Sequence, residues 1–383
     1  MKALEGIETP ALLLDRARLT RNVQRMEERA RSLGVKLRPH LKTCKSVDVA
    51  HLIPSAASHG ITVSTVKEAE YFAAAGLRDQ LLAVAVAPSR LRRVAALLRD
   101  GVRTRVALDS PVAIDWLEDA ASREGVRFEA LVEIDCGEHR SGVTPDSDLV
   151  PQLASRLARG RGTRFGGIFT HAGHSYGARD REALRAVAEQ ERAAIATVRE
   201  RIESIGIDVP IASVGSTPTA THAASLHGVT EIRAGVYVFH DLFQAAIGSC
   251  GIDDIATTVL ATVIGHQRAH GRILIDAGGL AMSKDRSTMA LGAHGDCGYG
   301  LLADVDSGQV FDGVLVSDVY QEHGVITARP GSRLDFDRFP LGSRVRVLPN
   351  HSCMTCSAYD AYHVIDGDAQ VALWPRIHEW SRA

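Results

Sequence analysis

Residues 60–75 read Gly-Ile-Thr-Val-Ser-Thr-Val-Lys-Glu-Ala-Glu-Tyr-Phe-Ala-Ala-Ala, and this stretch contains the repeating unit of the predicted fold. Its first part, 60–66, is a short run with several β-branched residues, which predicts a strand. Its second part, 66–75, places apolar residues at helical spacing among Lys and Glu, which predicts a helix. A strand followed directly by a helix is typical of parallel βαβ units.

The same unit recurs over the first two thirds of the chain. Eight segments are predicted as strands: 36–43, 60–66, 81–86, 104–109, 128–136, 165–171, 211–214 and 231–238. Helical patterns cover 15–33, 66–75, 91–98, 112–124 and 179–205. Eight such units in about 200 residues fit a (β/α)8 barrel, for which roughly 250 residues is typical. A doubly wound open sheet is the alternative, but no GxGxxG opens the first βα unit.

After about residue 246 the strand–helix pattern gives way to strands alone. Alternating or continuous β runs lie at 255–264, 272–277, 313–316 and 344–349, and Gly- and Asp-rich turns separate them. This texture is typical of antiparallel sheets. We therefore predict a barrel domain over residues 15–245 and a mainly antiparallel β domain over residues 246–383.

Composition excludes several classes of protein. Of 383 residues, 45% are hydrophobic and 23% are charged, which is typical of a globular protein. The 44 basic and 46 acidic residues leave a net charge of −2, which argues against nucleic-acid and acidic-membrane binding. No apolar run approaches the roughly 18–20 residues of a membrane span, and the amino end lacks the apolar core of a signal peptide. Six cysteines are too few for a disulfide scaffold, so a cytoplasmic protein is expected.

Polar residues concentrate at the predicted carboxyl ends of the strands. Catalytic groups of (β/α)8 barrels lie at these ends and in the loops that follow them. The polar ends are at 38–43, 64–65, 109, 133–135, 170–173, 215–217 and 233–235, whereas the opposite ends are mostly plain. This asymmetry predicts an enzyme.

Lys42 is the first candidate for chemistry. Alternate residues of a strand share one face, so Arg38, His40 and Lys42 are expected to point together into the barrel mouth. A free lysine has a pKa of about 10.4, and neighbouring cations and burial both favour the neutral amine that a Schiff base requires. The alternative, which the spacing alone favours, is that Lys42 and Lys45 are surface lysines at the start of the next helix.

A second candidate is the sequence Gly-Ser-Thr at 215–217, which follows the seventh predicted strand and opens a helix. The segment 233–237, Arg-Ala-Gly-Val-Tyr, is expected to lie on the eighth strand. Loops after strands seven and eight are the usual phosphate site of this fold, because a helix amino terminus supplies backbone N–H donors there. An ordinary helix-capping turn is the alternative.

A third candidate is the sequence Asn-His-Ser-Cys-Met-Thr-Cys at 350–356, which closes a β run of the second domain. On an extended segment His351 and Cys353 lie on one face, and both can reach one metal ion at roughly 2.0–2.3 Å. No second pair of Cys or His has matching spacing, so a closed structural site is not expected. Two protein ligands with open positions suit a catalytic metal, and a packed cysteine beside a hydrogen-bonded histidine is the alternative.

Further candidates are Arg140, His171, Tyr176 and the turn that contains Gln321 and His323. Taken alone, each is better explained as a polar core residue whose hydrogen bonds are satisfied.

Eight motifs together resemble one known family. They are Thr-Pro-Ala-Leu-Leu-Leu-Asp (9–15), Arg-Pro-His-Leu-Lys-Thr-Cys-Lys (38–45), Val-Ser-Thr-Val-Lys-Glu-Ala-Glu (63–70), Glu-Ile-Asp-Cys-Gly-Glu-His-Arg-Ser-Gly (133–142), Ser-Val-Gly-Ser-Thr-Pro-Thr (213–219), Arg-Ala-Gly-Val-Tyr-Val-Phe (233–239) and Pro-Asn-His-Ser-Cys (349–353), and Thr-His-Ala-Gly (170–173) also matches. The chain resembles the fold-type III pyridoxal-phosphate (PLP) enzymes of the D-threonine aldolase / D-serine dehydratase family. The resemblance runs nearly end to end.

The resemblance implies a cofactor, a metal and an assembly. Lys42 is the lysine that carries PLP, and His351 with Cys353 binds a divalent metal, Zn²⁺ first, with Mn²⁺ or Co²⁺ as alternatives. The other cofactor contacts are His40, Arg140, Tyr176, Ser216, Thr217, Gly235 and Tyr237. Segment 1–14 is expected to pack with the β domain, and two chains are expected to form a homodimer. Cys44 stands where the family often has His, so any role of that His does not carry over.

The metal ligands decide between two reactions. Within the family, His-x-Cys resembles the dehydratases and His-x-Asp the aldolases. We therefore expect β-elimination from a 3-hydroxy-D-amino acid, such as D-serine or D-threo-3-hydroxyaspartate, to a keto acid and ammonia. The alternatives are retro-aldol cleavage to glycine and an aldehyde, and a PLP carrier with little turnover. In this resemblance, the small fold-type III proteins that only carry PLP consist of the barrel alone. The β domain of this chain therefore argues against the carrier alternative.

Overall fold

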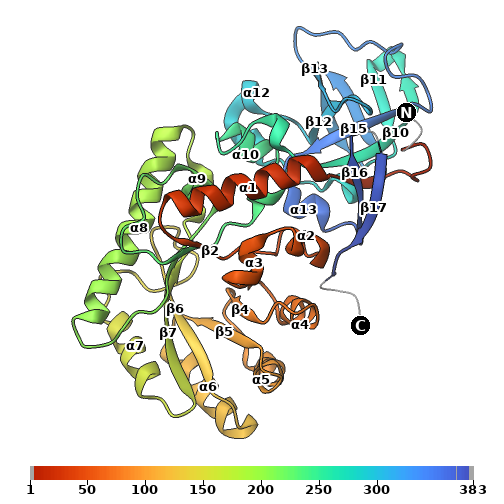
Figure 1. The fold of residues 1–383 in the computed structure, drawn as a ribbon. Coiled ribbons are helices and arrows are strands. Elements are labelled where there is room, and N and C mark those ends of the chain that lie inside the picture. Colours follow the sequence, from red (N-terminus) through yellow and green to blue (C-terminus); the bar gives the residue numbers. More distant parts are fainter. Residues whose placement is uncertain (1–3, 368, 379–383) are drawn as a thin grey trace. The chain divides into compact units, whose positions relative to one another are not determined.

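The computed structural model describes residues 4–367 and 369–378 (Figure 1). The chain forms two compact units. One is Gln24–Gly235, and the other joins the amino-terminal residues up to Val23 to Val236–His378. In the described part of the chain, no helix combines the length and the apolar character needed to cross a membrane.

The first unit is built on eight parallel strands. They are β2 (Lys36–Leu37), β3 (Ile61–Val63), β4 (Asp79–Leu82), β5 (Arg103–Leu108), β6 (Phe128–Ile134), β7 (Thr163–Thr170), β8 (Ala212–Val214) and β9 (Glu231–Ile232). They follow the order β2-β9-β8-β7-β6-β5-β4-β3. A parallel bridge between His40 and Thr62 joins the two ends of this sheet and closes it. The predicted (β/α)8 barrel is therefore confirmed.

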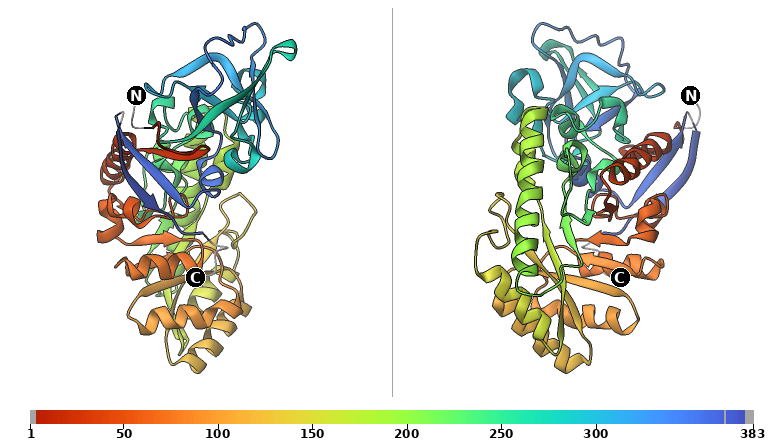
Figure 2. Two further views of the ribbon diagram at one scale, coloured as in Figure 1. Left: turned by 90° about the vertical axis from the view of Figure 1, so that its right-hand side faces the viewer. Right: turned by 60° about the vertical axis from the view of Figure 1, so that its left-hand side comes forward.

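Helices alternate with these strands along the chain, and the first helix belongs to the other unit as far as Val23. They are α1 (Arg16–Ser32), α2 (Val47–His51), α3 (Pro54–Ser58), α4 (Val66–Ala74), α5 (Leu91–Arg99), α6 (Pro111–Glu124), α7 (Leu149–Arg159), α8 (Arg181–Glu203) and α9 (Thr217–His222). Thr65, Ser110 and Asp180 begin α4, α6 and α8, and each side chain accepts a hydrogen bond from a first-turn N–H. Figure 2 shows the long α8 running along the outside of the barrel strands.

Apolar side chains fill the middle of the barrel. Leu81, Ala107, Leu131 and Phe169, from four successive strands, form one buried cluster. Such a layer is typical of this fold, whose interior is a packed core and not a pore. Polar chemistry is therefore confined to the two ends.

The first and last barrel strands are shorter than predicted. Residues 41–44 form a turn, because the Lys45 N–H donates to the Leu41 carbonyl at 2.8 Å. In the predicted segment 231–238, the last three residues form the 3-10 helix η3 (Val236–Val238) and not a strand. The expectation that Arg38, His40 and Lys42 share one face of a strand is therefore wrong.

Arg38 points to the amino end of the barrel and not to its mouth. Its guanidinium contacts Asp79 at 2.6 Å and Glu231 at 3.0 Å, the first residues of β4 and β9. Because these carboxylates lie where the strands begin, Arg38 contributes to a network opposite the mouth.

The second unit is a nine-stranded sheet. Its strands are β1 (Ala11–Asp15), β10 (Thr257–Gln267), β11 (Arg272–Ile275), β12 (Gly300–Ala303), β13 (Val310–Val319), β14 (Gly324–Ala328), β15 (Arg344–Pro349), β16 (Ala361–Asp366) and β17 (Ala369–Pro375). The order is β11-β14-β13-β12-β15-β10-β1-β16-β17, and β10 also pairs with β11, which closes six strands into a second barrel. Only β1 and β16 pair in parallel, so the predicted antiparallel β domain is confirmed.

Short helices connect these strands. They are α10 (Leu242–Ala246), η4 (Ile252–Asp254), η5 (Arg268–His270), α11 (Gly279–Met282), η6 (Ser287–Leu291), α12 (Gly292–Gly295) and α13 (Ser352–Cys356). The last of them follows β15 directly and carries the predicted metal-binding sequence.

Candidate functional site

Lys42 lies in the turn after β2, and its side chain is exposed, as the alternative of a surface lysine expects. Its role as the cofactor lysine stays a prediction. Its backbone N–H contacts the Nδ1 atom of His40 at 3.4 Å. Burial of the His40 ring and the positive charges of Lys42 and Arg233 hold the pKa of His40 well below its usual value. His40 is therefore neutral beside the Lys42 amine.

His171 follows β7 and is the second imidazole near Lys42. Its Nδ1 atom lies 2.5 Å from the Gly215 carbonyl oxygen, so Nδ1 carries the proton and donates. Burial and the charge of Lys42 lower the pKa of His171 to about 3. Two neutral imidazoles thus neighbour one exposed amine at the carboxyl end of the barrel.

Glu191, which the sequence analysis missed, ties together the loops after β7 and β8. This residue of α8 is only 1% exposed. Its Oε1 atom accepts the backbone N–H groups of Ala172 at 3.0 Å and Gly215 at 2.9 Å. Burial raises its pKa. In the sequence it is one of many charges at helical spacing, and no local signal distinguishes it.

Ser216 caps α9, as the alternative interpretation of 215–217 expected. Its hydroxyl accepts the Thr219 N–H at 3.2 Å and lies 3.1 Å from the Ser175 hydroxyl. Thr217 is the first residue of the helix and is buried. Capping does not exclude phosphate binding by this turn, which stays a prediction.

Gly215 and Gly235 allow close contact between the barrel strands. A Cβ atom on Gly215 would lie 2.8 Å from the backbone nitrogen of Arg233, and one on Gly235 would lie 2.8 Å from the carbonyl oxygen of His40. A larger residue at either position would push these neighbouring backbone segments apart. Gly235 is therefore placed next to the segment that carries Lys42.

The other predicted cofactor contacts lie in different surroundings. Arg140 is exposed and pairs with Glu138 at 3.3 Å, and its charge acts on His171. Tyr176 is half-buried in the 3-10 helix η2 (Gly173–Gly177). Tyr237 is buried in η3, which belongs to the other unit. The charge of Lys42 thus acts on both His40 and His171, and the charge of Arg140 acts on His171 alone of these.

The predicted metal ligands do come together, although not on an extended segment. His351 precedes α13 as its capping residue, and Cys353 lies in the first turn of that helix. The two side chains form a hydrogen bond. The prediction of a shared strand face was wrong because the backbone turns into a helix immediately after β15.

His351 also bonds to a carboxylate that the sequence analysis missed. Its Nδ1 atom lies 2.8 Å from Oδ2 of Asp285. Burial opposes a charge on the ring, but the hydrogen bonds to Asp285 and Cys353 raise the pKa of His351 to about 11. Burial likewise opposes the charge of Asp285, yet the hydrogen bonds from His351 and Ser287 lower its pKa to about 2. His351 and Asp285 thus form a hydrogen-bonded pair.

An imidazole nitrogen beside a thiol fits a zinc ion, which prefers these donors. Within the described residues, no group of three or more His, Cys, Asp and Glu side chains is arranged to hold a metal. A metal on His351 and Cys353 would therefore take its other ligands from water or substrate.

The segment that carries the pair is anchored on both sides. The Ser352 N–H donates to Asp241 at 3.0 Å, and the Thr355 hydroxyl donates to the Met282 carbonyl at 2.8 Å. The Asn350 side chain donates to the Gly298 carbonyl at 2.6 Å. These buried bonds hold His351 and Cys353 in a defined position. By contrast, Gln321 and His323 are exposed.

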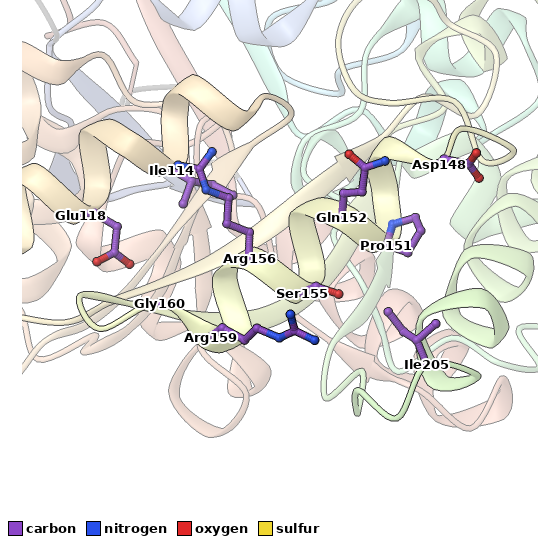
Figure 3. Close-up of a pocket in the computed structure, with 10 residues that line it drawn as sticks. All are labelled: Ile114, Glu118, Asp148, Pro151, Gln152, Ser155, Arg156, Arg159, Gly160 and Ile205. Atoms are coloured by element: carbon purple, nitrogen blue, oxygen red, sulfur yellow. The ribbon is translucent and has the colours of Figure 1, made fainter.

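A cavity of about 810 Å³ lies elsewhere in the barrel unit (Figure 3). Its lining comes from α6, α7 and the ends of neighbouring segments: Ile114, Glu118, Asp148, Pro151, Gln152, Ser155, Arg156, Arg159, Gly160 and Ile205. None of the predicted site residues is among them, so this cavity is not the candidate site.

Two family models match the chain in succession. The alanine racemase N-terminal domain covers residues 14–242, and a putative serine dehydratase domain covers residues 256–365. The chain therefore belongs to the family of the alanine racemase N-terminal domain. The predicted membership of the D-threonine aldolase / D-serine dehydratase group is confirmed.

Individual proteins of this family are similar to the chain in sequence and in structure. D-threo-3-hydroxyaspartate dehydratase of Delftia sp. HT23 is 45% identical over 377 residues, 98% of either chain. Its solved structure matches with a TM-score of 0.95 over 99% of this chain and 100% of that one, and a further solved form is its C353A mutant in the metal-free form. D-serine dehydratase of Dictyostelium discoideum is 31% identical over 96% of both chains. 3-Hydroxy-D-aspartate aldolase of Paracoccus denitrificans is 29% identical over 96% of this chain and 91% of its own.

Proposed function

We propose that the chain is a PLP- and metal-dependent dehydratase. It removes water from a 3-hydroxy-D-amino acid, D-threo-3-hydroxyaspartate or D-serine, and yields a 2-keto acid and ammonia. The observation that carries this proposal is the 45% identity to D-threo-3-hydroxyaspartate dehydratase over 98% of both chains. The contact between His351 and Cys353 supports it, because the motif His-x-Cys is the dehydratase pattern.

The residues at the carboxyl end of the barrel fit PLP. Bound PLP supplies an electron sink for breaking bonds at the substrate Cα. Lys42 is an exposed primary amine at the required end of the barrel, and Gly235 leaves the backbone beside it open to close approach. Ser216, Thr217, Arg140, Tyr176 and Tyr237, together with His40, are the further proposed contacts of the cofactor.

Lys42 has two roles in this proposal. It first holds the cofactor covalently, and once substrate has displaced it, its Nζ atom takes the proton from the substrate Cα. A base positioned in this way contributes roughly 10²–10⁴-fold to the rate. The neighbouring His40 and His171 are neutral and hold fixed hydrogen bonds, so they shape the site without competing for that proton.

His351 and Cys353 hold the proposed cation. A divalent metal held there would supply a Lewis acid, which makes a substrate β-hydroxyl a better leaving group. The imidazole and thiol donors favour Zn²⁺, with Mn²⁺ and Co²⁺ as alternatives. The solved relative described as a C353A mutant in the metal-free form is in keeping with a metal at this cysteine. The β-hydroxyl would take up one proton and leave as water, and the enamine product, as its imine tautomer, would react with a second water to give the 2-keto acid and ammonia.

Retro-aldol cleavage is the second candidate, because 3-hydroxy-D-aspartate aldolase is also a relative, at 29% identity. A base would take the hydroxyl proton, the Cα–Cβ bond would break to release an aldehyde, and a proton returned to Cα would give glycine. A cysteine in place of the aspartate of the aldolase pattern argues against it.

One assay separates these reactions. The purified PLP- and zinc-loaded protein is incubated with D-serine, D-threonine and D-threo-3-hydroxyaspartate, and keto acid, ammonia and glycine are quantified. We expect keto acid and ammonia in equal amounts. Glycine with an aldehyde would identify the aldolase, and absence of any product would contradict both reactions.

The proposal includes a cytoplasmic homodimer. None of the six cysteines, all of which lie in the described part of the chain, forms a disulfide, which is in keeping with a reducing compartment. Light scattering on the purified protein should give twice the chain mass of 41.1 kDa.

A further inference from the structure

Asp285 is the hydrogen-bond partner of the His351 ring. It lies in the loop between α11 and η6, 66 residues before His351 in the sequence. Its Oδ2 atom accepts the His351 Nδ1–H at 2.8 Å, and its Oδ1 atom accepts the Ser287 N–H at 2.8 Å and also the Ser287 hydroxyl. Both carboxylate oxygens are therefore engaged, and the side chain is only 21% exposed.

The loop of Asp285 is tied to the ligand segment at neighbouring points. The Thr288 hydroxyl and N–H both donate to the Asn350 side-chain oxygen, at 2.7 and 3.2 Å. The Asp285 N–H itself donates to the Ser283 hydroxyl at 3.0 Å. Because Asn350 directly precedes His351, the carboxylate and the imidazole cannot shift independently.

An ionised carboxylate accepts hydrogen bonds and donates none, so its partner nitrogen must carry the proton. The bond to Asp285 thus assigns the proton to Nδ1 of His351 and leaves the Nε2 lone pair for a cation. A carboxylate in this position also makes the imidazole a stronger ligand, and its loss typically lowers metal affinity 10–100-fold.

We propose that Asp285 is the positioning residue of the metal site: it holds His351 in the ring orientation and tautomer that bind the cation beside Cys353. This inference rests on the proposed metal-dependent function. Asp285 does not itself touch the metal, so its effect passes through the imidazole.

The main variant is Asp285→Asn, which keeps the shape of the side chain. The Ser287 N–H can only donate, so the amide oxygen stays on it, and the amide NH₂ then faces Nδ1 of His351. This arrangement favours the tautomer of His351 that has its proton on Nε2. A protonated Nε2 has no lone pair with which to bind the metal. Asp285→Ala, which removes the partner altogether, is the second variant.

Asp304→Ala is the matched control. Asp304 is in the same unit, and its Oδ1 atom likewise accepts a Ser N–H and hydroxyl, from Ser307 at 2.8 Å each. It caps a turn as Asp285 does, but no histidine is bonded to it in the described structure. A loss of turn capping alone would therefore affect Asp285 and Asp304 variants alike.

The measurement is the zinc dissociation constant of the PLP-loaded protein, obtained by competition with a chromophoric chelator at one pH. We expect weakening of 10-fold or more in Asp285→Asn and Asp285→Ala, and a change under twofold in Asp304→Ala. In the Co²⁺-loaded protein, the visible d–d bands should change in both Asp285 variants and stay unaltered in the control.

Unchanged zinc affinity and unchanged Co²⁺ bands in both Asp285 variants would overturn the positioning role, while wild-type turnover with zinc would still support the proposed function. If the wild-type protein itself bound no divalent metal, the proposed function and this inference would both fail. Circular dichroism and PLP absorbance establish that each variant is folded before its affinity is measured.

Discussion

At the amino end of the barrel every buried arginine has carboxylate partners, whereas at the carboxyl end Lys42 forms no ion pair with the described residues. Arg105 contacts Asp79 at 2.7 Å and Glu129 at 3.1 Å. The hydrogen bond from Arg103 and the charge of Arg105 hold the pKa of Glu129 below its usual value despite burial, and Arg105 with Arg38 does the same for Asp79. Around Lys42 the neighbours are neutral imidazoles.

This difference shows that one fold contains charged groups that stabilise the structure, such as Arg105, and a charged group that is available for chemistry, Lys42. A charge with a close opposite partner is stabilised in one protonation state and is poorly suited to exchange protons. An amine without such a partner is available for covalent chemistry and proton transfer. Substitutions at the two ends should therefore affect different properties.

The largest effect is expected at Lys42. Lys42→Ala should remove the visible absorbance of the lysine-bound cofactor and lower turnover by about 10³-fold or more, since the base and the covalent attachment are both lost. Lys45→Ala is the control, because Lys45 is paired with Glu68 at 3.2 Å. An absorbance band of lysine-bound cofactor that persists in Lys42→Ala would refute the assignment.

The next largest effect concerns the metal pair. Cys353→Ala should leave PLP absorbance intact but remove bound zinc and lower turnover by about 10²-fold or more, because one of two protein ligands is missing. Metal analysis and the keto-acid assay measure both quantities. Cys297→Ala, at a half-buried cysteine of the same unit, should change neither. Turnover that survives thorough chelation of the wild-type protein would rule out a catalytic metal.

At the amino end, substitution should affect stability and spare the chemistry. Arg105→Ala removes one buried guanidinium from Asp79 and Glu129, although Arg38 still pairs with Asp79 and Arg103 with Glu129, and the loss of hydrogen bonds to charged groups typically costs about 1.5–3 kcal/mol. The guanidinium unfolding midpoint should fall, while kcat at low temperature stays within about twofold of wild type. A large loss of kcat in a folded variant would contradict the division between the two ends.

The smallest expected effect is a pH dependence of folding stability, caused by His171 at the carboxyl end of the barrel. The pKa of His171 is about 3 in the folded protein and about 6.5 when unfolded, so the unfolded chain binds the proton more tightly. Stability is therefore full above pH 6.5 and should fall as the pH drops from 6.5 to 5, by about 1.5 kcal/mol for this one histidine.

His171→Asn tests this dependence, because its amide can still donate to the Gly215 carbonyl but has no proton to gain. The fall in the unfolding midpoint between pH 6.5 and 5 should be smaller in this variant than in wild type. An identical pH dependence in the two proteins would show that His171 is not buried in its neutral form.

The barrel was predictable because its units are local. The strand and helix of residues 60–75 follow from β-branched runs, helical spacing and the cap at Thr65, none of which depends on distant contacts. The ends of β2 and β9 were mispredicted because they depend on packing. The bridge of His40 to Thr62 and the contact of Gly235 with His40 turn the chain where the sequence suggests continued strands.

The residues of the proposed site were accessible from the sequence in part for the same reason. Lys42, His351 and Cys353 are recognisable because each stands in a short motif. Asp285 and Glu191 were missed because their partners are far away in sequence and nothing around them differs from an ordinary loop or helix. Such residues act through hydrogen bonds that only the folded chain creates.

By itself, the sequence determined the two fold classes, the family and the motifs that carry the amine, the imidazole and the thiol, because spacing and composition are properties of neighbouring residues. The tertiary structure alone decided the charge state of each group and its partner. It paired Arg38 and Arg105 with carboxylates, left Lys42 beside neutral rings and set Asp285 against His351. Burial and distances between remote segments set these interactions, and they exist only once the chain has folded.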